Sequence, residues 1–254
     1  GGLGLATAGG ARASAFRRPR GTVLALAVAA GGGLIAVVEG AVGRARGRPP
    51  AQAAARAMLL PLIIGTIPGV LAGLFLLKRF ESFRNLLIIG VAMLVACACF
   101  FLAEGFADRA DRAERTLSDL NAADGRWIGV AQAAAGLLAG LSRSGLTIAA
   151  GRVRRLNRVD AARFSFLLAL PLILGAGAKA LLDLRKVAGP TMSGSVLIAG
   201  FAASAVVGYL AIEFMLTFVR THSLRPFGVY LALLGMILIV AWVSPSRFPF
   251  LLPR

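Results

Sequence analysis

Long apolar runs alternate with short polar segments along most of this chain. Each run is about 20 residues long, and a helix of that length, rising 1.5 Å per residue, crosses a hydrocarbon layer of roughly 30 Å. The pattern therefore predicts membrane-spanning helices rather than one soluble core. The runs cover residues 22–42, 57–77, 86–106, 127–150, 164–182, 196–219 and 226–243.

The run at residues 127–150 differs from the others because its middle is polar. Gly136, Gly140 and Gly145 interrupt it, and the triplet Ser142-Arg143-Ser144 lies between the last two glycines. Irregular backbone at membrane depth is stable only where it lines a cavity or is enclosed by protein. Two short helices that dip into the membrane and return are one interpretation, and a single full crossing is the other. The chain is thus expected to be an all-α polytopic membrane protein with about six transmembrane helices plus a re-entrant helical hairpin.

Arg143 needs a compensating partner at this depth. A charged side chain at the centre of a bilayer costs roughly 2.5 to 3.5 kcal/mol even on the lenient insertion scale. The guanidinium offers five donors in a fork that matches phosphate, and neighbouring hydroxyls and backbone N–H groups would complete an anion site. Two other interpretations remain at this point: a side chain that snorkels to the interface, or one that is buried and paired with Glu104 or Glu213.

Composition supports the membrane assignment and restricts the partners. The 254 residues are 58% hydrophobic and 15% charged, with a mean hydropathy of +0.80. The net charge of +17 comes from short basic clusters between the apolar runs, as is typical of loops that face anionic lipid headgroups. We therefore expect membrane lipids and no nucleic acid among the partners.

The domain organisation is simple. Residues 1–21 are a basic N-terminal segment or the edge of a longer protein, residues 22–244 form a single integral membrane domain, and residues 245–254 are a C-terminal tail. The mixed-charge segment at residues 108–126 predicts a solvated amphipathic helix and turn. Glu39, near the end of the first run, is either an interfacial acid or a functional carboxylate.

A family resemblance rests on two motifs taken together. These are Gly140-Leu141-Ser142-Arg143-Ser144-Gly145-Leu146-Thr147 and the later Asp160-Ala161-Ala162-Arg163-Phe164-Ser165-Phe166-Leu167-Leu168-Ala169-Leu170-Pro171. They closely resemble the second signature region of the undecaprenyl-diphosphatase or bacitracin-resistance family. Gly65 with Ile67-Pro68, and Glu104 at the end of its run, are also similar to that family.

The resemblance implies a multi-pass enzyme of the bacterial inner membrane with inverted repeats. Such enzymes hydrolyse undecaprenyl diphosphate to the monophosphate and recycle this carrier for peptidoglycan and cell-wall synthesis, which links them to bacitracin resistance. By resemblance, Arg143 would grip the diphosphate, and Ser142 and Thr147 would bind or position it as catalytic residues. Gly140 and Gly145 would allow the turn, and Ser144 would complete the substrate site. A divalent cation, Mg or Ca, and a homodimer are further expectations, and the metal ligands are not identifiable.

The chain also departs from the family pattern. The proline usual before Gly140 is Ala139, and the first signature, a Glu-x-x-x-Glu pair followed by Ser-Ser-Thr-Gly-His, has no counterpart. The single histidine is His222, in a loop. Three alternatives to a working phosphatase therefore remain: a protein that binds or flips polyprenyl phosphates, an inactive truncated homologue, and a channel or structural subunit.

Overall fold

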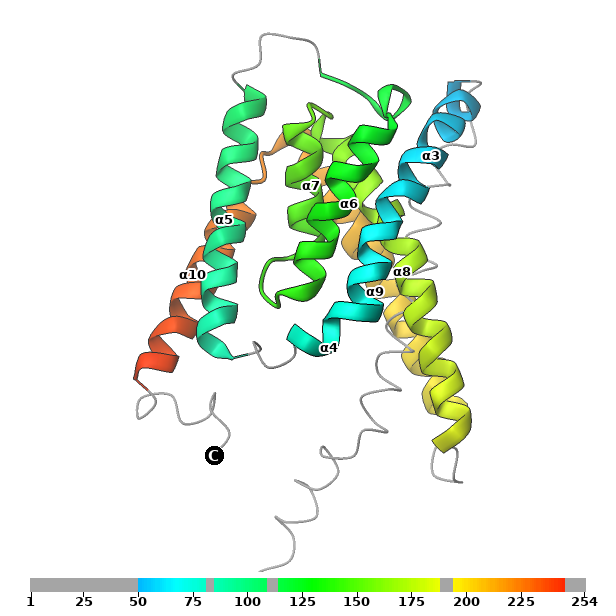
Figure 1. Ribbon diagram of the computed structural model, residues 1–254, viewed down its shortest axis with the longest axis vertical. Coiled ribbons are helices and arrows are strands. Elements are labelled where there is room, and N and C mark those ends of the chain that lie inside the picture. The colour runs from blue at the N-terminus through cyan, green and yellow to red at the C-terminus, as the bar shows by residue number, and fades with distance from the viewer. Residues whose placement is uncertain (1–49, 81–84, 109–113, 188–193, 245–254) are drawn as a thin grey trace, which may run out of the picture. The chain divides into compact units, whose positions relative to one another are not determined.

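The computed structural model describes residues 50–80, 85–108, 114–187 and 194–244. The described residues form helices joined by short connections, and their only β-type pairing is an isolated bridge between Arg115 and Leu156. The predicted span at residues 22–42 and Glu39 lie outside the described residues, and the inverted repeat, whose first half would include them, stays a prediction. In chain order (Figure 1) the elements are α3 (Pro50–Leu71), π-helix η1 (Ala72–Leu76), α4 (Leu77–Phe80), α5 (Leu86–Asp108), 3-10 helix η3 (Leu117–Asp119), α6 (Ala122–Leu137), α7 (Arg143–Val153), α8 (Arg158–Val187), α9 (Gly194–Thr221) and α10 (Arg225–Val243).

The chain divides into two compact units. Residues 41–172 and 213–254 form one unit, which contains α3 to α7, the first half of α8, the end of α9, and α10. Residues 1–40 and 173–212 form the other, and its described part consists of the second half of α8 and most of α9. The candidate site lies wholly in the first of these units.

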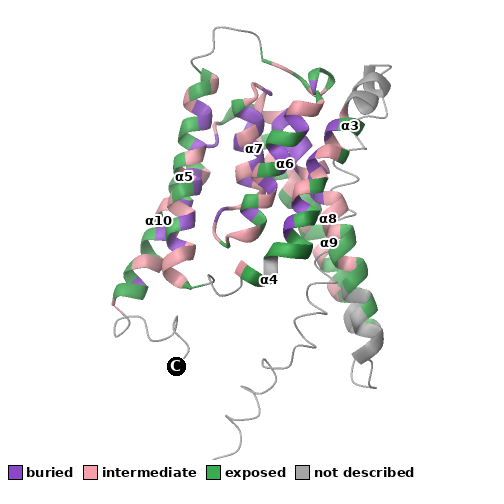
Figure 2. Ribbon diagram, viewed as in Figure 1, coloured by how far each residue is buried: buried purple, intermediate pink, exposed green. Residues whose placement is uncertain are grey.

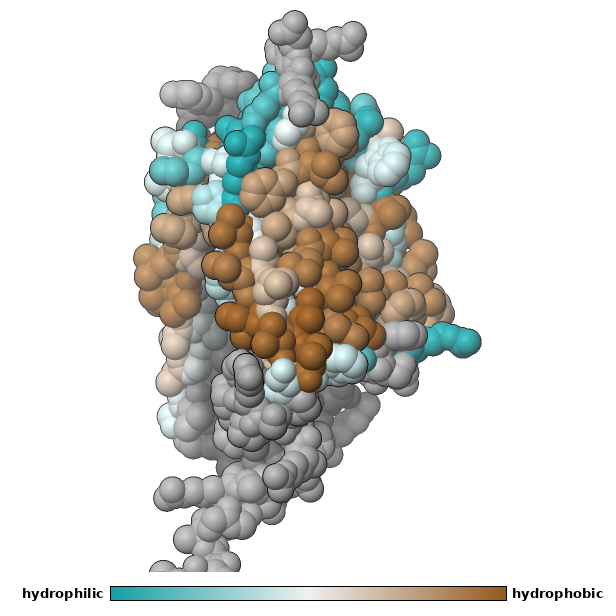
Figure 3. Space-filling model, turned by 90° about the vertical axis from the view of Figure 1, so that its left-hand side faces the viewer, coloured by the Kyte–Doolittle hydropathy of each residue, from teal (hydrophilic) through white to brown (hydrophobic). Residues whose placement is uncertain are grey.

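Five of the described helices are long and apolar enough to cross a membrane. They cover Met58–Leu76, Leu86–Asp108, Arg158–Lys179, Ile198–Thr221 and Arg225–Val243, in agreement with the predicted runs at these places. The face formed by α5 and α10 carries a broad hydrophobic band below a hydrophilic end (Figure 3). Large apolar side chains such as Val95, Phe106 and Tyr230 are exposed on these helices. The chain is therefore an all-α, multi-pass membrane protein, as predicted.

Close helix contacts explain the glycines of α3. Gly65 and Gly69 are four residues apart, and so are Gly125 and Gly129 on α6. A Cβ added at Gly129 would lie 2.5 Å from the carbonyl oxygen of Gly65, so the two backbones touch at this crossing. Small residues at this spacing let membrane helices approach closely. The helix α3 thus packs tightly on α6 although it contains Pro61 and Pro68.

The prediction of a solvated amphipathic helix and then a turn over residues 108–126 is wrong for residues 114–126, where the turn comes first and the helix follows. Residues 114–121 contain only the single turn η3 before α6 begins at Ala122. The backbone of Arg115 instead pairs with the segment after α7, because its N–H donates to the carbonyl of Arg155 at 2.8 Å and its carbonyl accepts from the N–H of Asn157 at 2.9 Å. Polar side chains here cap helices: Asn121 caps the N-terminus of α6.

Candidate anion site at the tip of a helical hairpin

The run at residues 127–150 forms a hairpin and does not cross as one helix. The helices α6 and α7 lie side by side and are joined by residues 138–142 (Figure 1). Their other ends meet, because Arg154 Nε donates to Asp124 Oδ1 at 2.6 Å. Arg115 donates to both oxygens of the same carboxylate, at 3.1 and 2.7 Å. The segment enters and returns on one side, so the re-entrant interpretation is confirmed.

Asp124 holds the open end of the hairpin together. Its carboxylate is fully buried, and it also accepts from the backbone N–H of Asn121 at 3.0 Å. Burial disfavours the ionised form, but the hydrogen bonds from Arg115 and Arg154 outweigh it and hold the pKa of Asp124 below its usual value. The side chain is therefore ionised at neutral pH.

The turn at the tip contains two residues with positive φ. Gly140 has φ of 103°, and a Cβ there would lie 2.5 Å from the carbonyl oxygen of Ile89 on α5. Ser142 has φ of 54°, which costs a residue with a side chain about 1 to 2 kcal/mol. The expectation that Gly140 allows the turn agrees with this geometry. Strained backbone of this kind persists where the surrounding structure requires it, often at functional sites.

The N-terminus of α7 is left without a cap. Ser142 makes no side-chain capping bond, and the first internal bond of the helix runs from the N–H of Leu146 to the carbonyl of Ser142 at 2.8 Å. Among the described residues, the N–H groups of Arg143, Ser144 and Gly145 have no acceptor. Free N–H groups and the positive end of the helix dipole together favour an anion at such a position.

Arg143 adds a guanidinium to the same helix end. Its side chain is half-buried, and no hydrogen bond or ion pair joins it to any residue in the described ranges. The alternative in which Arg143 pairs with Glu104 or Glu213 is therefore wrong. Glu104 is instead engaged by Arg158 and Arg152.

Thr147 is fixed within the protein. Its hydroxyl lies 2.6 Å from Ser165 Oγ on α8 and within 2.9 and 3.0 Å of the carbonyl oxygens of Arg143 and Ser144. Both hydroxyl-bearing side chains are buried. Of the two expected roles for Thr147, positioning fits these contacts better than direct binding. Ser165 lies in the Phe-Ser-Phe motif but was not predicted as a site residue, because the sequence does not show which hydroxyl faces Thr147.

Gly145 lies in the first turn of α7 and not in the connecting turn. A Cβ at this position would be 2.2 Å from Cζ of Phe100 on α5. The expected role of Gly145 in the turn is therefore wrong, and the glycine instead lets α7 pack directly on α5. Phe100 and Leu141 belong to the buried apolar cluster behind the tip, and Figure 2 shows buried residues gathered along α6 and α7.

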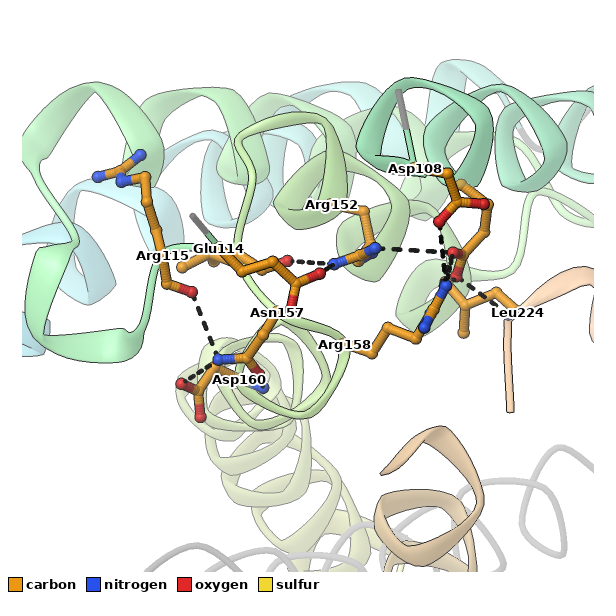
Figure 4. Close-up of polar contacts among 10 residues, drawn as sticks. Asp108, Glu114, Arg115, Arg152, Asn157, Arg158, Asp160 and Leu224 are labelled. Carbon is orange, nitrogen blue, oxygen red and sulfur yellow. Dashed lines mark hydrogen bonds and ion pairs between the residues drawn. The ribbon is translucent and has the colours of Figure 1, made fainter. Parts of the chain in front are cut away.

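A second polar cluster ties the open end of the hairpin to α5 and α10. Arg158 donates to Glu104 Oε1 and Oε2 at 3.2 and 3.1 Å through Nε and to Oε2 at 2.7 Å through Nη2. Arg152 lies 3.7 Å from Glu104 and 2.7 Å from Glu114. The N–H of Leu224 also donates to Glu104, at 3.1 Å. Figure 4 shows Arg152 and Arg158 turned toward this group, with Asp108 beside Arg158. Sequence reasoning noted Glu104 but missed these partners, which are at least 48 positions away in the chain.

The described residues do not supply a metal site. No group of three or more His, Cys, Asp or Glu side chains in the described ranges could hold an ion. The carboxylates of Glu104, Glu114 and Asp124, which contact or belong to the hairpin, are bound by arginines, and Glu39 lies outside the described residues. The expected divalent cation stays a prediction, and no step below is derived through it.

The fold and the hairpin define a class: multi-pass membrane proteins in which a re-entrant helical hairpin carries an arginine, here one with no ion-pair partner among the described residues. Within it, the chain belongs to the family of the bacitracin resistance protein BacA, whose family model matches residues 18–237. Membership, together with the five spans, assigns it to the inner membrane, as expected.

Several relatives carry the name undecaprenyl-diphosphatase. One from Desulforudis audaxviator is 39% identical over 180 residues, which are 70% of this chain and 66% of the relative. One from Synechococcus elongatus is 40% identical over 190 residues, 72% of this chain and 64% of the relative. One from Methanothermobacter thermautotrophicus is 40% identical over 182 residues, 71% of this chain and 98% of the relative. The chain thus spans less than two thirds of the length of the first two.

Proposed function

We propose that this chain is an undecaprenyl-diphosphatase, or the arginine-bearing part of one. It would hydrolyse the terminal phosphoanhydride of undecaprenyl diphosphate and release undecaprenyl phosphate and inorganic phosphate. The recovered monophosphate would serve as carrier for peptidoglycan and cell-wall synthesis, and its recycling would oppose bacitracin. The observation that supports this most is Arg143 at the uncapped N-terminus of α7, with no side-chain partner in the part of the chain that the structure describes.

The chemistry follows from this arrangement. Water attacks the terminal phosphorus, the bond to the bridging oxygen breaks, and negative charge gathers on the transferred phosphoryl group and on the leaving phosphate. Catalysis of phosphoryl transfer is largely positioning and charge stabilisation. Arg143 would bind non-bridging oxygens, and the free N–H groups of Ser144 and Gly145 would stabilise the charge that develops. Ser142 would contact the diphosphate through its hydroxyl, and Thr147 would hold the helix end in place.

The hydrocarbon chain of such a substrate needs an apolar surface. A groove of about 360 Å³ lies along α3 beside Pro171 and is almost entirely apolar. It is lined by Leu62, Ile63, Thr66, Ile67, Val70, Leu71 and Pro171. A polyprenyl chain would lie in this groove while its phosphates reach the tip of the hairpin.

A second function, one without hydrolysis, is supported by the positions of the described carboxylates and of the histidine. Glu104 and Asp124 lie at the open end of the hairpin and are held by arginines, and His222 lies after α9 with its Nδ1 bonded to Thr221, so none of the three is in place to activate water at the tip. A protein that binds or flips polyprenyl phosphates without hydrolysing them would need only the anion site. The homodimer stays a prediction, which the mass of the purified protein in detergent would test.

One experiment separates these functions. The purified chain in nanodiscs is given undecaprenyl diphosphate, and released phosphate is measured. Arg143→Ala should lower the rate on the order of 10²-fold or more. Arg143→Lys should be faster than Arg143→Ala but slower than wild type, because lysine keeps the positive charge but cannot bind phosphate through two parallel N–H groups. Binding without phosphate release by the wild-type chain would favour the transport function. Equal rates for wild type and Arg143→Ala would overturn the assignment of Arg143.

A further inference from the structure

Gln132 is a buried polar side chain that has no part in the reaction proposed above. It lies on α6 and is 1% exposed. Neither the amide nitrogen nor the amide oxygen has a hydrogen-bond partner among the described residues. Buried side-chain amides are nearly always satisfied, and the exceptions call for an explanation such as a ligand. The donor and the acceptor of Gln132 are both free, so one bound group could use both.

The neighbours of Gln132 on α3 and α8 cannot satisfy it. The amide nitrogen would be 2.9 Å from a Cβ added at Gly69, and Leu172 Cδ2 lies 3.2 Å from the same point. Gly69 has no side chain and Leu172 is apolar. Thr66 carries the one hydroxyl of α3, and this hydroxyl donates to the carbonyl of Leu62 at 2.7 Å.

The depth of Gln132 in the hairpin matches that of Arg143. Both helices can be measured from the ion pair between Asp124 and Arg154 at the open end. Gln132 is eight residues along α6 from Asp124, or about 12 Å, and Arg143 is eleven residues along α7 from Arg154, or about 16 Å. The difference of about 4 Å is less than one helical turn of about 5.4 Å.

We infer that Gln132 is a further binding residue for the phosphate head group of the polyprenyl substrate. Its amide N–H donates to a non-bridging phosphate oxygen, and its carbonyl accepts from a protonated phosphate oxygen or from a water that the phosphate holds. Arg143 supplies the charge from the tip, and Gln132 supplies a neutral, directional contact from α6. This inference rests on the proposed function for the identity of the ligand.

Binding of undecaprenyl phosphate tests the inference without any turnover. Gln132→Leu keeps the approximate size of the side chain and removes both polar atoms. The variant should be at least as thermally stable as wild type without ligand, because an unsatisfied buried amide is lost. It should bind undecaprenyl phosphate about tenfold more weakly, and its ligand-induced rise in Tm should shrink accordingly. The control is Thr221→Val at the end of α9, which removes a hydrogen-bonded hydroxyl outside the hairpin and the groove and should leave binding unchanged.

Several outcomes would overturn the inference. If Gln132→Leu binds undecaprenyl phosphate as tightly as wild type, the amide does not contact the head group. If the wild-type protein binds no undecaprenyl phosphate, the inference also fails, because its ligand is absent. If Gln132→Leu does not fold, Gln132→Met and Gln132→Asn give the same reading: Asn should retain more affinity than Met, and equal affinities would contradict the inference. Wild-type protein that binds the monophosphate but releases no phosphate from the diphosphate would refute the phosphatase function alone.

Discussion

Gly145 on α7 lies directly against the ring of Phe100 on α5. A Cβ at Gly145 would come within 2.2 Å of Cζ and 2.8 Å of Cε1 of that ring, and within 2.9 Å of Ser142 Oγ. Real Cβ atoms do not approach other heavy atoms this closely, so any side chain at position 145 must displace the ring, the helix end or both. The contact therefore fixes how far the tip of the hairpin stands from α5.

Gly145→Ala should destabilise the protein by about 1 to 3 kcal/mol, the usual cost of overpacking a core. It should also lower phosphate release, because the displaced helix end carries Arg143. Thermal unfolding in detergent and the rate with undecaprenyl diphosphate measure the two effects. Phe100→Leu in the same chain should recover part of both, since it removes the atoms that clash. A double variant no better than Gly145→Ala would show that the ring contact does not set the position of α7.

Glu104 should be the most sensitive residue of the open end. Glu104→Gln removes the charge that Arg158 and Arg152 share, and leaves buried Arg152 with Glu114 as its ion-pair partner. Breaking a buried pair by removing one partner costs on the order of 3 kcal/mol, so the thermal midpoint should fall by several degrees.

Asp108→Asn is the matched control for Glu104→Gln. Asp108 also pairs with Arg158 and with Arg225, but its side chain is 45% exposed, and exposed pairs contribute at most about 1 kcal/mol. Equal losses in the two variants would mean that burial of Glu104 does not strengthen its ion pairs.

Much of the helical framework and the hairpin could be predicted because each depends on local pattern. The apolar runs predict the five described spans, and the glycines and polar residues at 136–145 predict the break that becomes the turn. The unfavourable cost of Arg143 in hydrocarbon directed attention to the tip, where its role in binding stays a prediction.

The remaining contacts depend on pairs far apart in the chain, which no local pattern reveals. Gly145 was expected in the turn because glycine permits positive φ. It is instead helical, and the ring of Phe100 leaves no room for a side chain at this position. The segment at residues 114–121 has helical charge spacing, yet pairing of its backbone with residues 155–157 overrides that preference. In the sequence Gln132 looks like an ordinary helix residue. Only the structure shows that its amide has no hydrogen-bond partner among the described residues.

Acid should loosen the open end of the hairpin through Asp124. Because its folded pKa lies below the unfolded value, the carboxylate contributes stability that is fully present above the ordinary aspartate pKa. That contribution is lost as pH falls through the folded value. The thermal midpoint should therefore be flat from pH 7 to about pH 5 and then decline.

Asp124→Asn isolates this effect. The variant should be less stable at pH 7, since Arg115 and Arg154 lose their shared partner, and its midpoint should depend less on pH below about pH 5. If wild type and Asp124→Asn lost stability in parallel on acidification, other carboxylates would be responsible.

Thr147 and Ser165 should act as a unit that positions Arg143. Thr147→Val keeps the shape of the side chain and removes the hydroxyl that lies between Ser165 and the carbonyls of Arg143 and Ser144. We expect a loss of about 1 kcal/mol in stability and a severalfold lower kcat, because the helix end is held less firmly. KM should change little, since Thr147 is buried and bonded within the protein.

A double-mutant cycle distinguishes positioning from direct contact with substrate. If the two hydroxyls act together, Thr147→Val and Ser165→Ala should each lower kcat, and the double variant should be little worse than either alone. Thr147→Ser keeps the hydroxyl and should stay near wild-type rates. If Ser165→Ala leaves kcat unchanged while Thr147→Val abolishes activity, Thr147 contacts the substrate itself. In that case its bonds to the two carbonyls must open before the diphosphate binds.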